Sequence, residues 1–206
     1  LIQIGRLHLL KTFTQKMKWI LLSVFVAASI FGHVVPAAVP AAVLKAACED
    51  FPNGTSTAVN WWNCNSVDVV QVSAMKVEDS SGQEEYPVDV DQLVIMDLTQ
   101  TNSGPQIDRT LVDASVWEWN TGPLGCRWGV IPTLGLTNNM DGCKDGGCPI
   151  KAGTGNMKLT LDLTEFKPII DLMPTGKPYQ LRMKVKDASN KKEVACVYLQ
   201  MKITKS

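Results

Sequence analysis

The feature that most constrains the fold of this chain is an alternation of apolar and polar residues that recurs from residue 58 onward. Residues 157–163 read Met-Lys-Leu-Thr-Leu-Asp-Leu, and residues 179–185 read Tyr-Gln-Leu-Arg-Met-Lys-Val. Successive side chains of a strand point to opposite faces, so each run has one buried face and one solvated face. Further runs rich in β-branched and apolar residues span 88–99, 110–119 and 194–204. The pattern predicts strands.

Turn-forming sequences separate these runs. Stretches that contain Gly, Pro, Asn or Asp occur at 80–82, 102–105, 121–123, 174–176 and 187–190. No sustained helical period of apolar residues follows residue 58. About seven strands separated by turns predict an all-β fold, an immunoglobulin-like antiparallel β-sandwich.

The N-terminal part of the chain has the features of a secretory signal. Met17-Lys18 precedes an uncharged, mostly apolar stretch at 19–31 and small residues around 37–42. The apolar stretch is shorter than the roughly 20 residues that a membrane-spanning helix needs, although a buried helix or an anchor is the alternative. We interpret 17–42 as a signal peptide, 1–16 as an upstream non-native segment, 43–57 as a linker and 58–206 as the folded domain.

Charge and histidine content exclude several classes of function. Four of the 20 basic side chains and both histidines precede residue 43, so 16 basic groups remain against all 20 acidic ones. A domain without histidine has neither a Ser-His-Asp nor a Cys-His catalytic arrangement, and it has no His-containing metal site. Clustered basic residues, as nucleic-acid binding requires, are absent from the sequence, and so is a G-x-S-x-G nucleophile motif. We predict no enzymatic activity, cofactor, metal or nucleic-acid partner.

Six cysteines, all after residue 47, predict three disulfides in an oxidising compartment. A short disulfide between Cys143 and Cys148 fits the Gly-rich loop 141–148 better than a zinc site, which lacks further ligands. Asn53-Gly54-Thr55 is an N-glycosylation sequon, so we expect a glycan on Asn53, although its occupancy is open.

Two apolar segments and a pair of tryptophans are features that the core of a filled β-sandwich does not by itself explain. The segments 128–136 and 166–174 are interrupted by prolines, and they either line the mouth of an inter-sheet cavity or pack under a loop. In the run 110–119, Val112, Ala114 and Val116 form one apolar face, and Trp117 and Trp119 fall on the opposite face. They are either an exposed contact for a membrane or partner, or core residues after a bulge; Glu118 would otherwise point inward, which favours the bulge.

Two stretches carry a resemblance to a known family. Residues 61–72 read Trp-Trp-Asn-Cys-Asn-Ser-Val-Asp-Val-Val-Gln-Val, and residues 141–150 contain Asp-Gly-Cys-Lys followed by Cys-Pro-Ile. Pro-Thr-Gly at 174–176 and Val-Ala-Cys-Val-Tyr at 194–198 continue the match. Over 58–206 the chain resembles the ML lipid-recognition family, most closely its Niemann-Pick type C2-like, sterol- and lipid-binding branch.

The resemblance implies disulfides between Cys64 and Cys196 and between Cys143 and Cys148, which leaves Cys48 for Cys126. It also implies sheets that are splayed at one end around a lipid cavity. For the strand residues among the candidate lipid contacts, ordinary core packing is the alternative. The candidates are Ile131, Leu134, Leu136, Leu159, Leu161, Ile169, Ile170, Leu172, Met173, Leu181 and Met183.

The function that the resemblance implies is a secreted lipid-binding or lipid-transfer protein that holds a sterol or other lipid between two β-sheets. Expected ligands are a sterol, fatty acid or phospholipid, with a membrane or receptor contact for handover. The expected location is extracellular, with delivery to the lysosome as one route. Gly135 stands where the sterol-transfer branch has an aromatic pocket residue, and this leaves sterol specificity open. The alternative is a secreted immunoglobulin-like module that recognises a protein receptor or a glycan without bound lipid.

Overall fold

The computed structural model describes residues 49–122, 125–144 and 146–206. They belong to the compact unit Lys45–Ser206. The proposed upstream segment 1–16, the signal peptide 17–42 and the linker as far as residue 48 lie outside the described residues. These assignments therefore stay predictions. Within the described part, no helix is both long and apolar enough to cross a bilayer.

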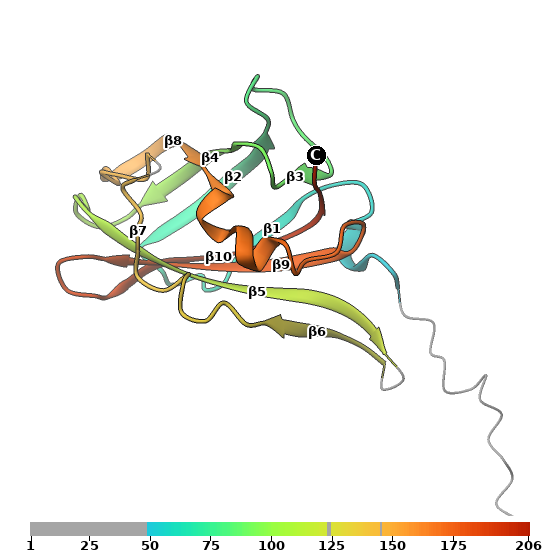
Figure 1. Cartoon of the computed structure of the whole chain (residues 1–206). Coiled ribbons are helices and arrows are strands. Elements are labelled where there is room, and N and C mark those ends of the chain that lie inside the picture. The colour runs from blue at the N-terminus through green and yellow to red at the C-terminus, as the bar shows by residue number, and fades with distance from the viewer. Residues whose placement is uncertain (1–48, 123–124, 145) are drawn as a thin grey trace, which may run out of the picture. The chain divides into compact units, whose positions relative to one another are not determined.

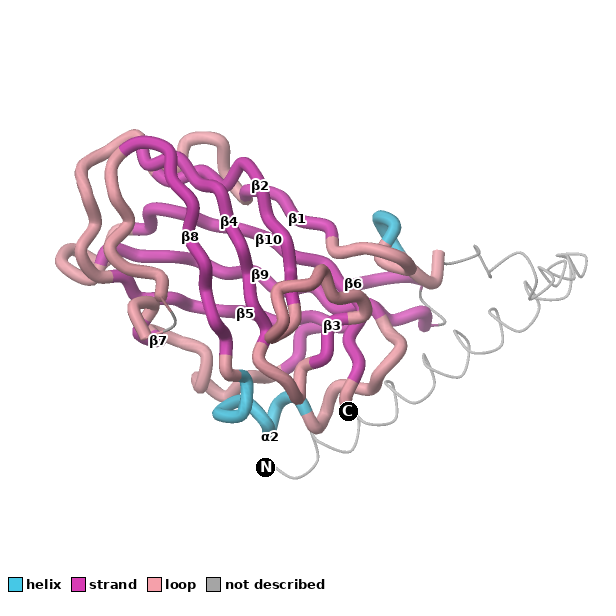
Figure 2. The backbone as a smooth tube through the Cα atoms, turned by 90° about the horizontal axis from the view of Figure 1, so that it is seen from above, coloured by secondary structure: helices cyan, strands magenta, loops and turns pink. Residues whose placement is uncertain are grey.

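Two stacked β-sheets make up the described part (Figures 1 and 2). The larger sheet contains, in pairing order, β1 (Asn60–Asn63), β10 (Glu193–Thr204), β9 (Pro178–Asp187), β5 (Thr110–Gly122) and β6 (Gly125–Ile131). The short strands β3 (Val88–Asp89) and β7 (Met140–Asp141) pair with β10 and β5. The smaller sheet is β2 (Val70–Glu78), β4 (Val94–Asn102) and β8 (Gly153–Leu161). All pairs are antiparallel except β3 with β10, and the predicted β-sandwich is confirmed.

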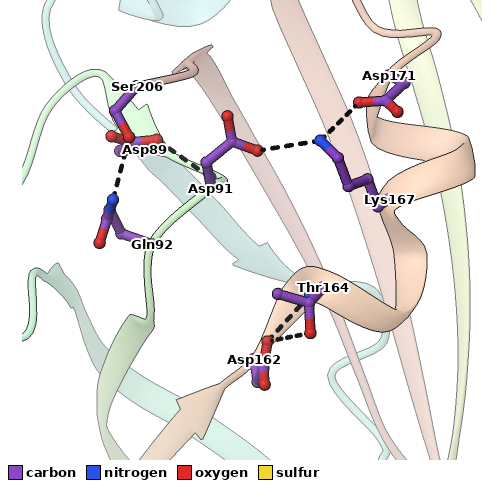
Figure 3. Close-up of polar contacts among 8 residues, drawn as sticks. All are labelled: Asp89, Asp91, Gln92, Asp162, Thr164, Lys167, Asp171 and Ser206. Atoms are coloured by element: carbon purple, nitrogen blue, oxygen red, sulfur yellow. Dashed lines mark hydrogen bonds and ion pairs between the residues drawn. The ribbon is translucent and has the colours of Figure 1, made fainter.

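Two of the differences between the observed strands and the predicted runs concern the run 88–99 and the segment 128–136. The run 88–99 forms two strands, because the Asp89 carboxylate accepts a hydrogen bond from the Asp91 backbone N–H (3.0 Å) and turns the chain between β3 and β4 (Figure 3). The second difference is β6, which occupies the start of the proline-interrupted segment 128–136. Among the described residues there are ten strands, two of them only two residues long.

A bulge in β2 keeps its apolar side chains on one face. The pairing register with β4 shifts between Val72 and Ala74. Without this shift Ala74 and Lys76 would share a face with Val72, whereas the bulge places Met75 and Val77 there. Met75 therefore packs against the core between the sheets.

A short helical segment follows β8 and spans the space between the two sheets (Figure 1). It consists of the 3-10 helix η3 (Leu163–Phe166) and the single turn α2 (Lys167–Ile170), and a second 3-10 turn, η2 (Pro52–Gly54), precedes β1. The Asp162 carboxylate caps η3 by accepting from the Thr164 backbone N–H (3.0 Å) and hydroxyl (2.7 Å). Lys167 contacts Asp171 at 3.0 Å and Asp91 at 3.9 Å, linking α2 to the β3–β4 turn (Figure 3).

Two of the three predicted disulfides are present. Cys64–Cys196 joins the end of β1 to β10 with Cα atoms 5.2 Å apart, and Cys143–Cys148 closes the predicted small loop. Cys126 is also disulfide-bonded. Its predicted partner, Cys48, lies outside the described residues, so that pairing stays a prediction.

The favoured interpretation of Trp117 and Trp119, a bulge that turns them into the core, is wrong. β5 pairs in continuous register with β9 and β6. Both tryptophans therefore lie on the outer face of the larger sheet, and Glu118 lies on the inner face opposite Tyr179. Glu118 is tolerated there because the Lys177 ammonium pairs with its carboxylate.

Candidate functional site

A cavity of about 100 Å³ lies between the two sheets. The smaller sheet contributes side chains from β2, β4 and β8, and the larger sheet contributes side chains from β5, β9 and β10. The loop around the Cys143–Cys148 disulfide lies against one part of it. The lining residues are Val70, Val72, Met75, Leu98, Gln100, Thr110, Val112, Gly142, Gly147, Ile150, Met157, Leu159, Met183, Val185, Ala195 and Val197.

Strand alternation explains how these residues converge. Leu98 and Gln100 are two apart on β4, and Met157 and Leu159 are two apart on β8, so each pair shares a face. Met183 on β9 lies opposite Val197 on β10 within the other sheet. The cavity therefore forms where the inner faces of both sheets meet.

The chemistry of the lining is apolar and uncharged. Valine, leucine, isoleucine and methionine predominate, and no lining residue within the described part of the chain carries a titratable side chain. Met75, Met157 and Met183 are unbranched and flexible, so they can change rotamer around a guest molecule. The polar side chains in the lining are those of Gln100 and Thr110. Such a surface binds by removing apolar area from water.

Glycines let the small disulfide loop pack closely against this cavity. A Cβ atom on Gly147 would lie 2.3 Å from the Gly142 carbonyl oxygen and 3.4 Å from a Leu159 methyl group. A Cβ atom on Gly142 would lie 2.4 Å from the Thr110 hydroxyl oxygen. Gly147 therefore requires glycine because it lies against backbone, whereas a side chain at Gly142 would force the Thr110 side chain to move.

The structure separates the sequence-predicted lipid contacts into three groups. Leu159 and Met183 line the cavity, and Leu161 and Leu181 pack in the adjoining core. Another group, Ile131, Ile169, Ile170 and Met173, packs together around α2, with Tyr179 and Ile203. Leu134, Leu136 and Leu172 are exposed, with 90%, 52% and 70% of their surface accessible. Lipid contact by any of these residues stays a prediction.

Sequence reasoning did not single out most of the lining. Leu98, Met157 and Val197 belong to predicted strand runs, and Val70 and Val72 lie in the stretch 61–72 that carries the family resemblance. Nothing local distinguishes these residues from ordinary core residues. Gln100 carries a usable signal, because it lies in phase with the apolar face of β4 where a polar side chain is unexpected.

A larger hollow of about 580 Å³ lies elsewhere, on the loops that flank β5 and β9. Its lining contains charged and polar side chains beside Ile107, Leu111 and Ala188, and two of the charged side chains are engaged by other protein groups. Arg109 contacts Asp141 at 3.3 Å, and the Asp187 carboxylate accepts from the Ser189 hydroxyl (2.7 Å) and backbone N–H (2.8 Å). These Ser189 hydrogen bonds lower the pKa of Asp187. This hollow therefore differs from the inter-sheet cavity, because charged side chains form part of its lining.

Comparison with solved structures finds similar folds, including the following three. A Niemann-Pick type C2 protein from Japanese carpenter ant is 15% identical, with a TM-score of 0.42 over 70% of this chain and 99% of that one. Chicken MD-1 complexed with lipid IVa is 10% identical, with a TM-score of 0.34 over 70% of this chain and 98% of that one. The C-terminal domain of wzt is 10% identical, with a TM-score of 0.36 over 80% of this chain and 86% of that one.

Among curated protein sequences, none matches the chain significantly. A protein-family model described as the ML domain matches residues 58–203. This range begins just before β1 and ends within β10, so it contains both sheets and the cavity between them. Because the model matches well over half of the chain, this protein belongs to the ML domain family.

Proposed function

We propose that this protein binds a lipid between its two β-sheets and carries it without chemical change. The observation that carries the proposal is the uncharged, methionine-containing cavity between the sheets of an ML domain. A lining without titratable side chains provides no general acid, base or nucleophile, whereas it suits the apolar body of a lipid.

The size of the cavity indicates how a lipid would be accommodated. A volume of about 100 Å³ is smaller than that of small-molecule pockets, which commonly exceed about 300 Å³. A complete acyl chain or sterol therefore requires the lining to rearrange. Met75, Met157 and Met183 lie on both sheets and provide that adaptability.

Burial of hydrocarbon alone supplies enough free energy for binding. A chain of about 15 methylenes gains about 12 kcal/mol at about 0.8 kcal/mol each. Association costs of at least about 4 kcal/mol leave at most about 8 kcal/mol, which corresponds to micromolar affinity when the cost is at this lower limit. No charged contact is needed.

The finer parts of the proposal concern the ligand, location and modification. We propose a sterol, fatty acid or phospholipid as cargo, secretion through the signal at 17–42, and handover at a membrane or receptor. The disulfides support an extracellular location because they persist in oxidising compartments, and delivery to the lysosome is the other route that we propose. Asn53 is exposed, and its side-chain Nδ2, where a glycan would attach, donates to the Gln200 carboxamide oxygen (2.6 Å).

The first experiment identifies co-purifying lipid by mass spectrometry and measures uptake of a fluorescent sterol and a fluorescent fatty acid. A matched pair of substitutions ties uptake to the cavity. Ala195→Leu adds volume inside the cavity, whereas Ala74→Leu adds the same atoms on the exposed face of β2. We expect Ala195→Leu to lower uptake at least about tenfold and Ala74→Leu to leave it unchanged.

Recovery of no lipid, together with no uptake by the unmodified protein, would overturn the proposal. That result would instead favour a receptor- or glycan-recognising sandwich. Equal uptake by the two alanine variants would show that lipid binds outside this cavity. Circular dichroism of both variants confirms that the fold is retained.

A further inference from the structure

Two buried carboxamides lie on the inner face of β4, and their hydrogen bonding differs. Asn102 is 2% exposed, and its Nδ2 donates to the carbonyl oxygens of Pro105 (2.8 Å) and Ile150 (3.3 Å). Its Oδ1 accepts from the Gly104 backbone N–H at 2.9 Å. Asn102 is therefore satisfied by the loop that follows β4 together with the Ile150 carbonyl.

Gln100, two residues earlier, is 6% exposed and lines the cavity. Its Oε1 has no hydrogen-bond partner among the described residues. A third buried carboxamide, Gln200, follows the usual rule: its Oε1 accepts from Asn53, and its Nε2 donates to Gln180 (2.7 Å). Buried polar groups in proteins are nearly always paired, so the orphaned acceptor of Gln100 requires an explanation.

The surroundings of Gln100 leave room for a partner. Its neighbour on β8 is Gly155, where a Cβ atom would meet no other atom within 4 Å. Its neighbour on β2 is Val72, which also lines the cavity and offers no hydrogen-bonding side chain. Neither strand neighbour offers the buried Oε1 a side-chain partner, so a group that enters the cavity has no competitor there for this oxygen once the lining rearranges.

We propose that the Gln100 carboxamide is the polar anchor of this cavity and selects lipids that present a hydroxyl group to the space between the sheets. This inference rests on the proposed lipid-binding function. A hydroxyl both donates and accepts, so it satisfies either orientation of the carboxamide. A carboxylate is disfavoured because no cavity-lining residue in the described part of the chain carries a compensating charge. A bare hydrocarbon end leaves Oε1 unpaired.

The test compares 1-hexadecanol with its methyl ether, which keeps the chain and the oxygen but lacks the hydroxyl hydrogen. Both compete with a fluorescent lipid for the disulfide-bonded protein. We expect the alcohol to bind about tenfold more tightly, as one hydrogen bond to an otherwise unpaired acceptor implies. In Gln100→Met, a substitution of similar length without the acceptor, we expect the two affinities to agree within about twofold.

Thr110→Val is the matched control, because Thr110 is the other polar side chain in the lining and its hydroxyl lies 3.4 Å from the Cys148 sulfur. We expect this variant to keep the tenfold preference.

Equal binding of alcohol and ether by the unmodified protein would overturn the anchor while leaving lipid binding intact. A preference that persists in Gln100→Met, or disappears in Thr110→Val, would overturn the assignment to Gln100. Binding of neither compound, nor of the fluorescent lipid, would refute the proposed function itself. The comparison in the unmodified protein stands even if Gln100→Met fails to fold.

Discussion

At the residue scale, the inner face of β4 contains two buried carboxamides with opposite effects on the stability of the fold: Asn102 raises it and Gln100 lowers it. Asn102 makes three hydrogen bonds, whereas Gln100 leaves a buried oxygen unpaired. An unsatisfied buried acceptor lowers stability by about 1–3 kcal/mol, and its replacement by an apolar group of similar shape removes that cost. Gln100 therefore lowers the stability of the fold while it places a polar group at the cavity.

The expected consequence is opposite stability changes for the same substitution at the two sites. Gln100→Leu should raise the free energy of unfolding by about 1 kcal/mol, because the unpaired oxygen disappears. Asn102→Leu should lower it by about 2 kcal/mol or more, since the carbonyls of Pro105 and Ile150 lose their donor. Urea unfolding at pH 7 measures both. Destabilisation by Gln100→Leu would mean that its carboxamide is already paired in the folded protein.

Tyr179 couples the stability of the fold to alkaline pH. It is 1% exposed, and its hydroxyl donates to the Pro174 carbonyl oxygen at 2.7 Å. Burial, and secondarily the Glu118 carboxylate, raise the pKa of Tyr179 well above the ordinary value of 10.0. The unfolded state therefore loses this proton at a lower pH than the folded state.

Stability should accordingly be complete below about pH 10 and should fall above it, by at most about 1.4 kcal/mol per pH unit from this group. Tyr179→Phe removes the ionisation, so its unfolding free energy should decline less steeply between pH 9 and 11. At neutral pH it should be about 1 kcal/mol less stable, because the hydrogen bond to Pro174 is lost. Urea titrations at several pH values measure both effects, and parallel pH profiles for the two proteins would contradict this account.

At the element scale, the outer face of the larger sheet is held together by aromatic contacts across strands. Trp62 on β1 stacks on Tyr198 of β10 with ring centroids 5.3 Å apart, and Trp117 of β5 lies 6.4 Å from Tyr198. The Arg182 guanidinium of β9 lies 5.3 Å from the centre of the Trp117 ring. These residues connect four neighbouring strands. A membrane or partner contact at this face stays a prediction.

The two described disulfides connect elements over very different chain lengths. Cys64–Cys196 spans 132 residues between β1 and β10, whereas Cys143–Cys148 spans five. In the chain-entropy model their removal should cost about 5 and about 2 kcal/mol, respectively. Paired Cys→Ser variants compared by urea unfolding measure the difference. Equal losses of stability would show that the short disulfide acts mainly by holding its loop in place, with Gly147 packed against Gly142 and Leu159, rather than through chain entropy.

At the scale of the whole molecule, the absence of titratable groups in the described lining has a direct consequence for function. Residues 49–206 contain no histidine, because the two in the chain are His8 and His33. Binding of an uncharged lipid should therefore change by less than about twofold between pH 5 and pH 8. Equilibrium uptake of a fluorescent sterol across this range measures it. A tenfold change would place a titratable group at the binding site, contrary to the lining described above.

The sequence was a good guide to local structure and to the family. Period-two runs predicted most of the strands, and the ML resemblance gave two disulfides that the structure contains. The resemblance did not identify the cavity, because only Leu159 and Met183 of the proposed contacts line it. From the sequence, the apolar segment around Ile169 and Ile170 fitted a cavity mouth as well as packing under a loop. In the structure Pro168 lies in the helical turn that begins at Lys167, and both isoleucines pack in one cluster with Tyr179.

The amino-acid sequence by itself determined the alternating strands, the disulfide-bonded ML domain and its lack of imidazole chemistry, because these depend on residue type and spacing. Only the tertiary structure decided which faces meet. Alternation shows that Trp117 and Glu118 point in opposite directions but not which one points inward, since that depends on register across three strands. Likewise, Asn102 finds partners in a nearby loop and Gln100 faces an apolar cavity, because the distance between two packed sheets depends on all the side chains between them.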